Sequence, residues 1–139
     1  MMQSETWLMG ERTLRRILVA DDEPDILEIS RIALEVVGGF EVAVCASGSE
    51  LLDQAVRFRP DLIVMDVLMP GMEGVEVLES LRRRAEFESV PVVLLTGLAP
   101  EIELQKLEEA GAAGVIRKPF DPMALADRLK AIWNAGNDR

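Results

Sequence analysis

The sequence has 139 residues, which suits a single domain, and 49% of them are hydrophobic, enough for a substantial core. It contains no histidine and only one cysteine, Cys45, which excludes His-ligated zinc, Ser–His and Cys–His catalysis, and an internal disulfide. The formal net charge of -10 argues against binding to nucleic-acid phosphates. Because neither a signal-peptide pattern nor an apolar run of membrane-spanning length is present, we expect a cytoplasmic protein without membrane contacts.

Five short runs of the β-strand type follow one another along the chain, and an amphipathic segment of the helix type follows each of them. Runs one, three and four are almost entirely apolar, as strands buried on both faces are. The predicted strands span residues 16–20, 40–45, 61–65, 91–95 and 114–117. The predicted helices span 24–37, a segment capped by Ser47, 74–84, 100–110 and 121–134.

Apolar spacing assigns a buried face to each helical segment. In the first segment the apolar positions are Ile26, Ile29, Ala33 and Val36. In the last they are Met123, Ala126, Leu129 and Trp133. The arginines at 82–84, which end the third segment, are expected to complement the helix dipole and to remain solvated.

The alternation of strands and helices predicts an α/β fold with a doubly wound parallel sheet of the flavodoxin-like (βα)5 type. Of the two common strand orders, 2-1-3-4-5 is the one with five strands. In it, the direction in which successive strands are added to the sheet switches between strands one and three. The domain is predicted to span 15–134, between a flexible N-terminal tail at 1–14 and a short C-terminal tail at 135–139. No output domain is expected after the last helix.

Polar side chains stand at the carboxyl ends of four predicted strands. Asp21 and Asp22 follow the first strand, Asp66 the third, Thr96 ends the fourth, and Lys118 follows the fifth. With the order 2-1-3-4-5, the three aspartates border the crevice in which such folds bind ligands. Carboxylate oxygens suit Mg²⁺, and an aspartate can accept a phosphoryl group as a nucleophile. A lysine ammonium and a hydroxyl would then meet the charge on the phosphoryl oxygens.

This ordered set of residues resembles the receiver domain of two-component response regulators, in the stand-alone form typified by the chemotaxis regulators. The resemblance covers roughly Arg15 to Trp133. The matching elements are Asp21-Asp22, Asp66, Met69-Pro70-Gly71-Met72-Glu73-Gly74, Thr96 and Lys118-Pro119-Phe120.

The resemblance implies a role for each site residue. A histidine kinase or a histidine phosphotransfer protein would donate the phosphoryl group to Asp66. Mg²⁺ would be held by Asp21, Asp22, Asp66 and the backbone carbonyl of Leu68. Thr96 would move toward the phosphoryl group, Lys118 would pair with it, and the Lys118–Pro119 peptide bond would be cis.

The implied function is a signalling module that catalyses only its own phosphorylation and dephosphorylation. It would act through protein contacts or pass the phosphoryl group on, and its downstream target is not indicated. One residue departs from the family pattern: the usual Tyr, Phe or His three places before the lysine is Val115 here. The aromatic half of the usual switch is therefore missing, and we expect the loop 97–100 after Thr96 to carry any change in conformation.

Three alternative functions use the same fold or the same residues. A pseudo-receiver would act as an adaptor without ever being phosphorylated. A phosphatase of the haloacid dehalogenase type also uses an aspartate nucleophile and Mg²⁺, but needs a second aspartate two residues later, where this chain has Leu68. A flavin carrier is disfavoured because the acidic loop after the first strand would repel the flavin phosphate.

Overall fold

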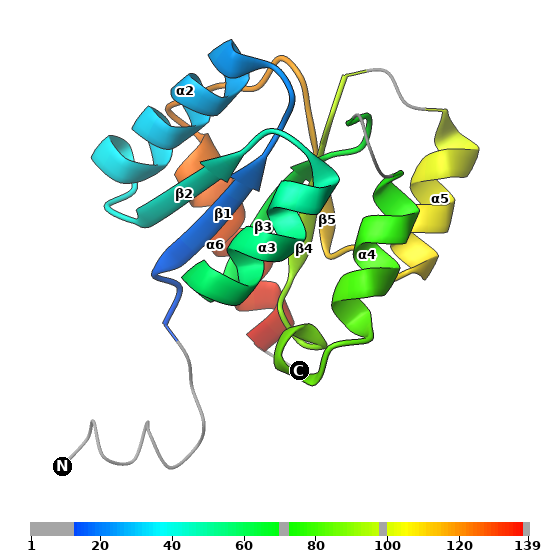
Figure 1. Ribbon diagram of the computed structural model, residues 1–139. Coiled ribbons are helices and arrows are strands. Elements are labelled where there is room, and N and C mark those ends of the chain that lie inside the picture. Colours follow the sequence, from blue (N-terminus) through cyan, green and yellow to red (C-terminus); the bar gives the residue numbers. More distant parts are fainter. Residues whose placement is uncertain (1–12, 70–72, 98–99, 138–139) are drawn as a thin grey trace, which may run out of the picture.

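The computed structural model describes residues 13–69, 73–97 and 100–137 of the chain. Its five parallel strands lie in the order β2-β1-β3-β4-β5, which confirms the predicted doubly wound α/β fold (Figure 1). The strands are β1 (Arg16–Ala20), β2 (Glu41–Cys45), β3 (Leu62–Asp66), β4 (Val92–Thr96) and β5 (Gly114–Arg117). The helices are α2 (Pro24–Ile32) with the π-helical turn η1 (Ala33–Val37), α3 (Gly48–Phe58), α4 (Gly74–Arg82) with the 3₁₀ turn η2 (Ala85–Phe87), α5 (Glu101–Glu109) and α6 (Leu125–Asn137).

Two hydrophobic cores lie on opposite faces of the sheet. Because successive side chains of a strand point to opposite faces, Ile63 and Met65 of β3 enter one core and Leu62 and Val64 the other. The first core packs against α3, α4 and α5, and the second against α2, η1 and α6 (Figure 1). Every residue of β3 and β4 is buried, which explains their apolar composition. Because all of these strands are parallel, their carboxyl ends lie at one edge of the sheet.

The first helix buries a different stripe from the predicted one. Ala33 is buried as predicted, together with Ser30 and Leu34, but Ile29 and Val36 are 41% and 77% exposed. The segment contains so many apolar residues that its spacing fits more than one helical phase. Packing against β2 and α6 selects the phase, so the prediction was wrong for Ile29 and Val36.

The ends of the domain also differ in detail from the prediction. Leu14, which the sequence analysis placed in the tail, is buried in the core on the α2 and α6 face. Met123 precedes α6 and is 68% exposed, while Ala126, Leu129 and Trp133 are buried as predicted. Within the described residues, no helix is both long enough and apolar enough to cross a bilayer.

Arg83 and Arg84 are exposed as predicted, but Arg82 is partly buried. The Arg82 guanidinium donates hydrogen bonds to the carbonyl oxygens of Phe87 and Val90, both at 2.9 Å, and of Gly111 at 3.1 Å. Burial lowers the pKa of Arg82. The side chain therefore joins the end of α4 to the segment before β4 and to the turn before β5.

Replacing Arg82 with Met keeps the aliphatic stem and removes the donors. We expect the free energy of unfolding to fall by about 2–3 kcal/mol, because hydrogen bonds made by a charged donor contribute about 1.5–3 kcal/mol. Urea unfolding followed by circular dichroism measures the change. Arg83→Met is the matched control: Arg83 is exposed and donates to Ser80 Oγ at 3.3 Å. Equal losses in the two variants would contradict a structural role specific to Arg82.

Candidate functional site

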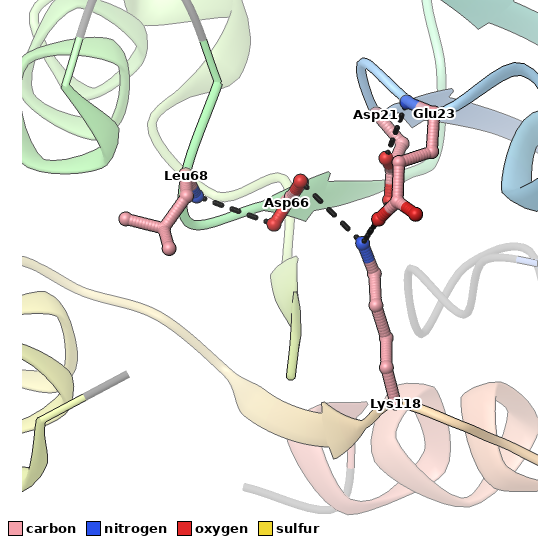
Figure 2. Close-up of polar contacts among 5 residues, drawn as sticks. All are labelled: Asp21, Glu23, Asp66, Leu68 and Lys118. Carbon is pink, nitrogen blue, oxygen red and sulfur yellow. Dashed lines mark hydrogen bonds and ion pairs between the residues drawn. The ribbon is translucent and has the colours of Figure 1, made fainter. Parts of the chain in front are cut away.

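Three charged side chains from separate strands meet at the carboxyl edge of the sheet (Figure 2). Asp21 directly follows β1, Asp66 is the last residue of β3, and Lys118 directly follows β5. Lys118 Nζ lies 2.7 Å from Asp21 Oδ2 and 3.5 Å from Asp66 Oδ2. The structure thus brings together residues that the sequence analysis had placed at different strand ends.

Glu23 belongs to the same group, although the sequence analysis did not identify it. Lys118 Nζ donates a hydrogen bond to Glu23 Oε1 at 2.9 Å, and the backbone N–H of Glu23 donates to Asp21 Oδ1 at 2.9 Å (Figure 2). Glu23 is also the residue that precedes helix α2. The sequence feature that could have identified Glu23 is its place as the third acidic residue in the run 21–23. An acidic residue just before Pro24 is equally typical of an ordinary helix start.

Backbone hydrogen bonds hold the two buried carboxylates in place. Asp21 is fully buried, and its N–H donates to the carbonyl oxygen of Cys45 at 3.1 Å, which ties the end of β1 to β2. Asp66 is 6% exposed, and its Oδ1 accepts a hydrogen bond from the N–H of Leu68 at 3.2 Å. Asp22, the next residue after Asp21, is exposed. The site therefore has two fixed, buried acidic groups and two exposed ones, Asp22 and Glu23.

The surroundings shift the pKa values of Asp66 and Lys118. Burial raises the pKa of Asp66 to about 6; the Asp21 charge adds to this rise, whereas the Leu68 N–H and Lys118 oppose it. Burial alone would lower the pKa of Lys118, but its close contacts with the Asp21 and Glu23 carboxylates and the Asp66 charge raise it above its usual range. Lys118 is therefore an ammonium at neutral pH, and Asp66 holds its proton to a higher pH than an exposed aspartate does.

The raised pKa of Asp66 predicts a pH-dependent stability. In the unfolded chain the carboxyl has a pKa of about 3.9, so ionising it costs more in the folded state. The neutral carboxyl of Asp66 therefore favours the folded state. Its contribution to the free energy of unfolding is fully present below about pH 4 and is lost as the pH rises through the folded-state pKa of about 6.

Asp66→Asn cannot ionise and should avoid that loss. Without Mg²⁺ we expect it to match the stability of the wild type near pH 4 and to exceed it by about 1–2 kcal/mol at pH 7. Urea unfolding from pH 4 to pH 8 in the presence of a chelator measures the difference. A difference that stays constant over this range would show that ionisation of Asp66 does not cause it.

The acidic residues of the site form a group with the chemistry of a metal site. One carboxylate oxygen from each of Asp21, Asp22, Glu23 and Asp66 lies within 4.8 Å of the others. An all-oxygen donor set suits a hard divalent cation better than a soft one. The residues present therefore fit a bound cation of this class.

Thr96 contributes a buried hydroxyl. The residue is 1% exposed, and its Oγ1 has no hydrogen-bond partner in the part of the chain that the structure describes. Its backbone carbonyl accepts a hydrogen bond from the N–H of Lys118 at 2.7 Å, which joins the end of β4 to the segment after β5. A buried hydroxyl without a partner is costly, so this group is suited to bind an added ligand.

The remaining predicted positions are only partly described. The Lys118–Pro119 peptide bond is cis, as the resemblance implied. Val115 is half-buried and packs against the core on the α4 and α5 side of the sheet. Residues 70–72 of the predicted motif and residues 98 and 99 of the loop after Thr96 lie outside the described residues. The role of the Leu68 carbonyl stays a prediction.

Comparisons with known proteins agree with this geometry. The family model of the response regulator receiver domain matches residues 17–130. The DNA-binding response regulator MtrA of Mycolicibacterium smegmatis is 38% identical over 124 residues, which cover 89% of this chain and 53% of that protein. The transcriptional regulatory protein PhoP of Bacillus subtilis, named for alkaline phosphatase synthesis, is 36% identical over 118 residues, with 85% and 48% covered. The chain thus spans about half the length of these curated relatives.

Solved structures show the same similarity over a larger share of the other chain. The chemotaxis response regulator CheY4 of Vibrio cholerae superposes with a TM-score of 0.79 at 32% identity, covering 86% of this chain and 99% of that one. A CheY-like receiver domain protein from Methanospirillum hungatei JF-1 has a TM-score of 0.81 at 29% identity, with 91% and 98% covered.

Proposed function

The chain belongs to the response regulator receiver domain family of two-component signal transduction, and on that premise we propose that it accepts a phosphoryl group on Asp66. One observation carries this proposal: Asp66 is a buried carboxylate in contact with the only lysine of the site, beside a group of further carboxylates. The site thus combines an anionic nucleophile, Asp66, with nearby groups that can offset the negative charge of an incoming phosphoryl group.

In the proposed reaction, an oxygen of ionised Asp66 forms a bond to phosphorus as the bond between phosphorus and the donor atom breaks. The donor keeps the electron pair of the broken bond, and Asp66 becomes an acyl phosphate. Lys118 Nζ, 3.5 Å from Asp66 Oδ2, needs only a short movement to reach a phosphoryl oxygen. The Thr96 hydroxyl, which has no hydrogen-bond partner within the described residues, would donate to another phosphoryl oxygen.

We propose Mg²⁺ as the metal of the site, held by Asp21, Asp22, Asp66 and the backbone carbonyl of Leu68. When bound, it would offset the charge of the carboxylates and of the phosphoryl oxygens. The support is the group of acidic oxygens within 4.8 Å of one another, which Mg²⁺ suits by its preference for oxygen ligands.

The proposed partners are proteins. A histidine kinase or a histidine phosphotransfer protein would supply the phosphoryl group, and a cytoplasmic location follows because such kinases draw on cellular ATP. The names of MtrA and PhoP concern DNA binding and transcription by those proteins. For this chain, with its formal net charge of -10, we propose no contact with nucleic acid.

Output is proposed to pass through protein contacts or through onward phosphoryl transfer. Val115 is short and stiff at χ1, and it cannot sweep across the surface as an aromatic ring would. We therefore place the change of conformation mainly in the loop 97–100, where Gly97 has room around its Cα. The direct test of the proposed function is incubation with acetyl phosphate and Mg²⁺, followed by measurement of the intact mass.

A further inference from the structure

We propose that Glu23 is a positioning residue that holds the Lys118 ammonium in a resting position closer to Asp21 than to Asp66. The contact itself is independent of phosphorylation. Its consequence, a limit on how readily Lys118 reaches a phosphoryl group, rests on the proposed function.

The distances around Lys118 Nζ define this resting position (Figure 2). Glu23 Oε1 at 2.9 Å accepts a charge-assisted hydrogen bond, and Asp21 Oδ2 at 2.7 Å forms a close ion pair. Asp66 Oδ2 at 3.5 Å lies beyond the usual N–H···O range. Lys118 thus donates a hydrogen bond to Glu23, forms a close ion pair with Asp21, and lies farther from Asp66.

Glu23 acts on Lys118 through two separate contacts. Its carboxylate pairs directly with Nζ, and its backbone N–H donates to Asp21 Oδ1, which orients the other oxygen of Asp21 toward the same ammonium. Asp21 is fully buried, whereas the Glu23 side chain is 59% exposed. A change of the Glu23 side chain therefore removes one direct partner of Lys118 and leaves the buried pair with Asp21 in place.

The expected effect is modest because the Glu23 carboxylate is exposed. An exposed ion pair contributes little free energy, so removing one changes an equilibrium constant or a rate by up to about fivefold. A phosphoryl group on Asp66 would attract Lys118 against this contact. Glu23 should therefore lower the affinity of the site for a phosphoryl group by a factor within that limit.

Lysine labelling tests the contact without any phosphorylation. The chain has three lysines, at 106, 118 and 130, so digestion after brief acetylation can report each of them separately. With a chelator present, we expect Lys118 to react more slowly than the exposed Lys106 in the wild type. Glu23→Gln should raise the Lys118 rate by about twofold to fivefold and leave Lys106 and Lys130 unchanged.

Asp25→Asn is the matched control for this experiment. Asp25 is an exposed carboxylate in the first turn of α2, so its loss changes the net charge equally without touching the Lys118 contacts. The Lys118 rate in Asp25→Asn should equal that of the wild type. An unchanged Lys118 rate in Glu23→Gln, or an equal rise in both variants, would overturn the proposal.

Titration with beryllofluoride in the presence of Mg²⁺ tests the consequence, because beryllofluoride stands in for the phosphoryl group. We expect Glu23→Gln to bind it up to about fivefold more tightly than the wild type, and Asp25→Asn to bind it as the wild type does. Faster labelling without tighter binding would overturn the claim that Glu23 limits Lys118. A wild type that binds no beryllofluoride would count against the proposed function, while the labelling result would still decide whether Glu23 holds Lys118.

Discussion

Asp66→Asn is expected to gain no phosphoryl group from acetyl phosphate and Mg²⁺ under conditions in which the wild type gains one. The amide is not an anionic nucleophile, whereas Asp66 is a buried carboxylate of the acidic group with Lys118 Nζ 3.5 Å from its Oδ2. Intact-mass measurement counts the phosphoryl groups, and sensitivity to hydroxylamine identifies an acyl phosphate. The same variant should remain folded, since it is expected to be more stable than the wild type at neutral pH.

The loss should be specific to Asp66. Asp25→Asn, which removes an exposed carboxylate outside the site, should gain one phosphoryl group as the wild type does. Labelling retained in Asp66→Asn would mean that another side chain accepts the phosphoryl group. A wild type that gains none from acetyl phosphate or from any histidine-phosphorylated donor would instead favour the adaptor alternative, in which the family fold is kept without the chemistry.

Asp22→Ala is expected to weaken Mg²⁺ binding by about tenfold or more, which corresponds to about 1.4 kcal/mol of lost interaction. The reason is charge crowding: two carboxylates about 4 Å apart repel by roughly 4 kcal/mol at an effective dielectric of 20, and a cation relieves this repulsion. Because Asp22 is exposed, its removal should leave the core intact. Isothermal titration calorimetry measures the affinity directly.

Asp25→Asn again separates the site from the general charge of the chain. Its Mg²⁺ affinity should be close to that of the wild type, because Asp25 lies outside the group of clustered carboxylates. Mg²⁺ should also raise the thermal stability of the wild type and of this control, since a ligand that binds only the folded state stabilises it. Unchanged affinity in Asp22→Ala would remove Asp22 from the metal site.

The amino-acid sequence by itself determined the strand order and the positions of the main site residues. A buried parallel strand appears in the sequence as an apolar run. A polar residue at the end of such a run lies at the carboxyl edge of the sheet. Asp21, Asp66, Thr96 and Lys118 were predictable for this reason, and so was their common location. These features depend on which residues a strand contains, and they do not require the exact packing of the helices.

Only the tertiary structure decided which side chains touch. The contact of Glu23 with Lys118 joins residues 95 positions apart, and it depends on the register of β1, β3, β4 and β5 and on the direction in which α2 begins. The buried stripe of the first helix and the carbonyl partners of Arg82 depend in the same way on neighbouring elements. Local periodicity records how buried each position is along its own element. It does not identify which residue lies on the other side of a contact, because that depends on how all the helices and strands pack together.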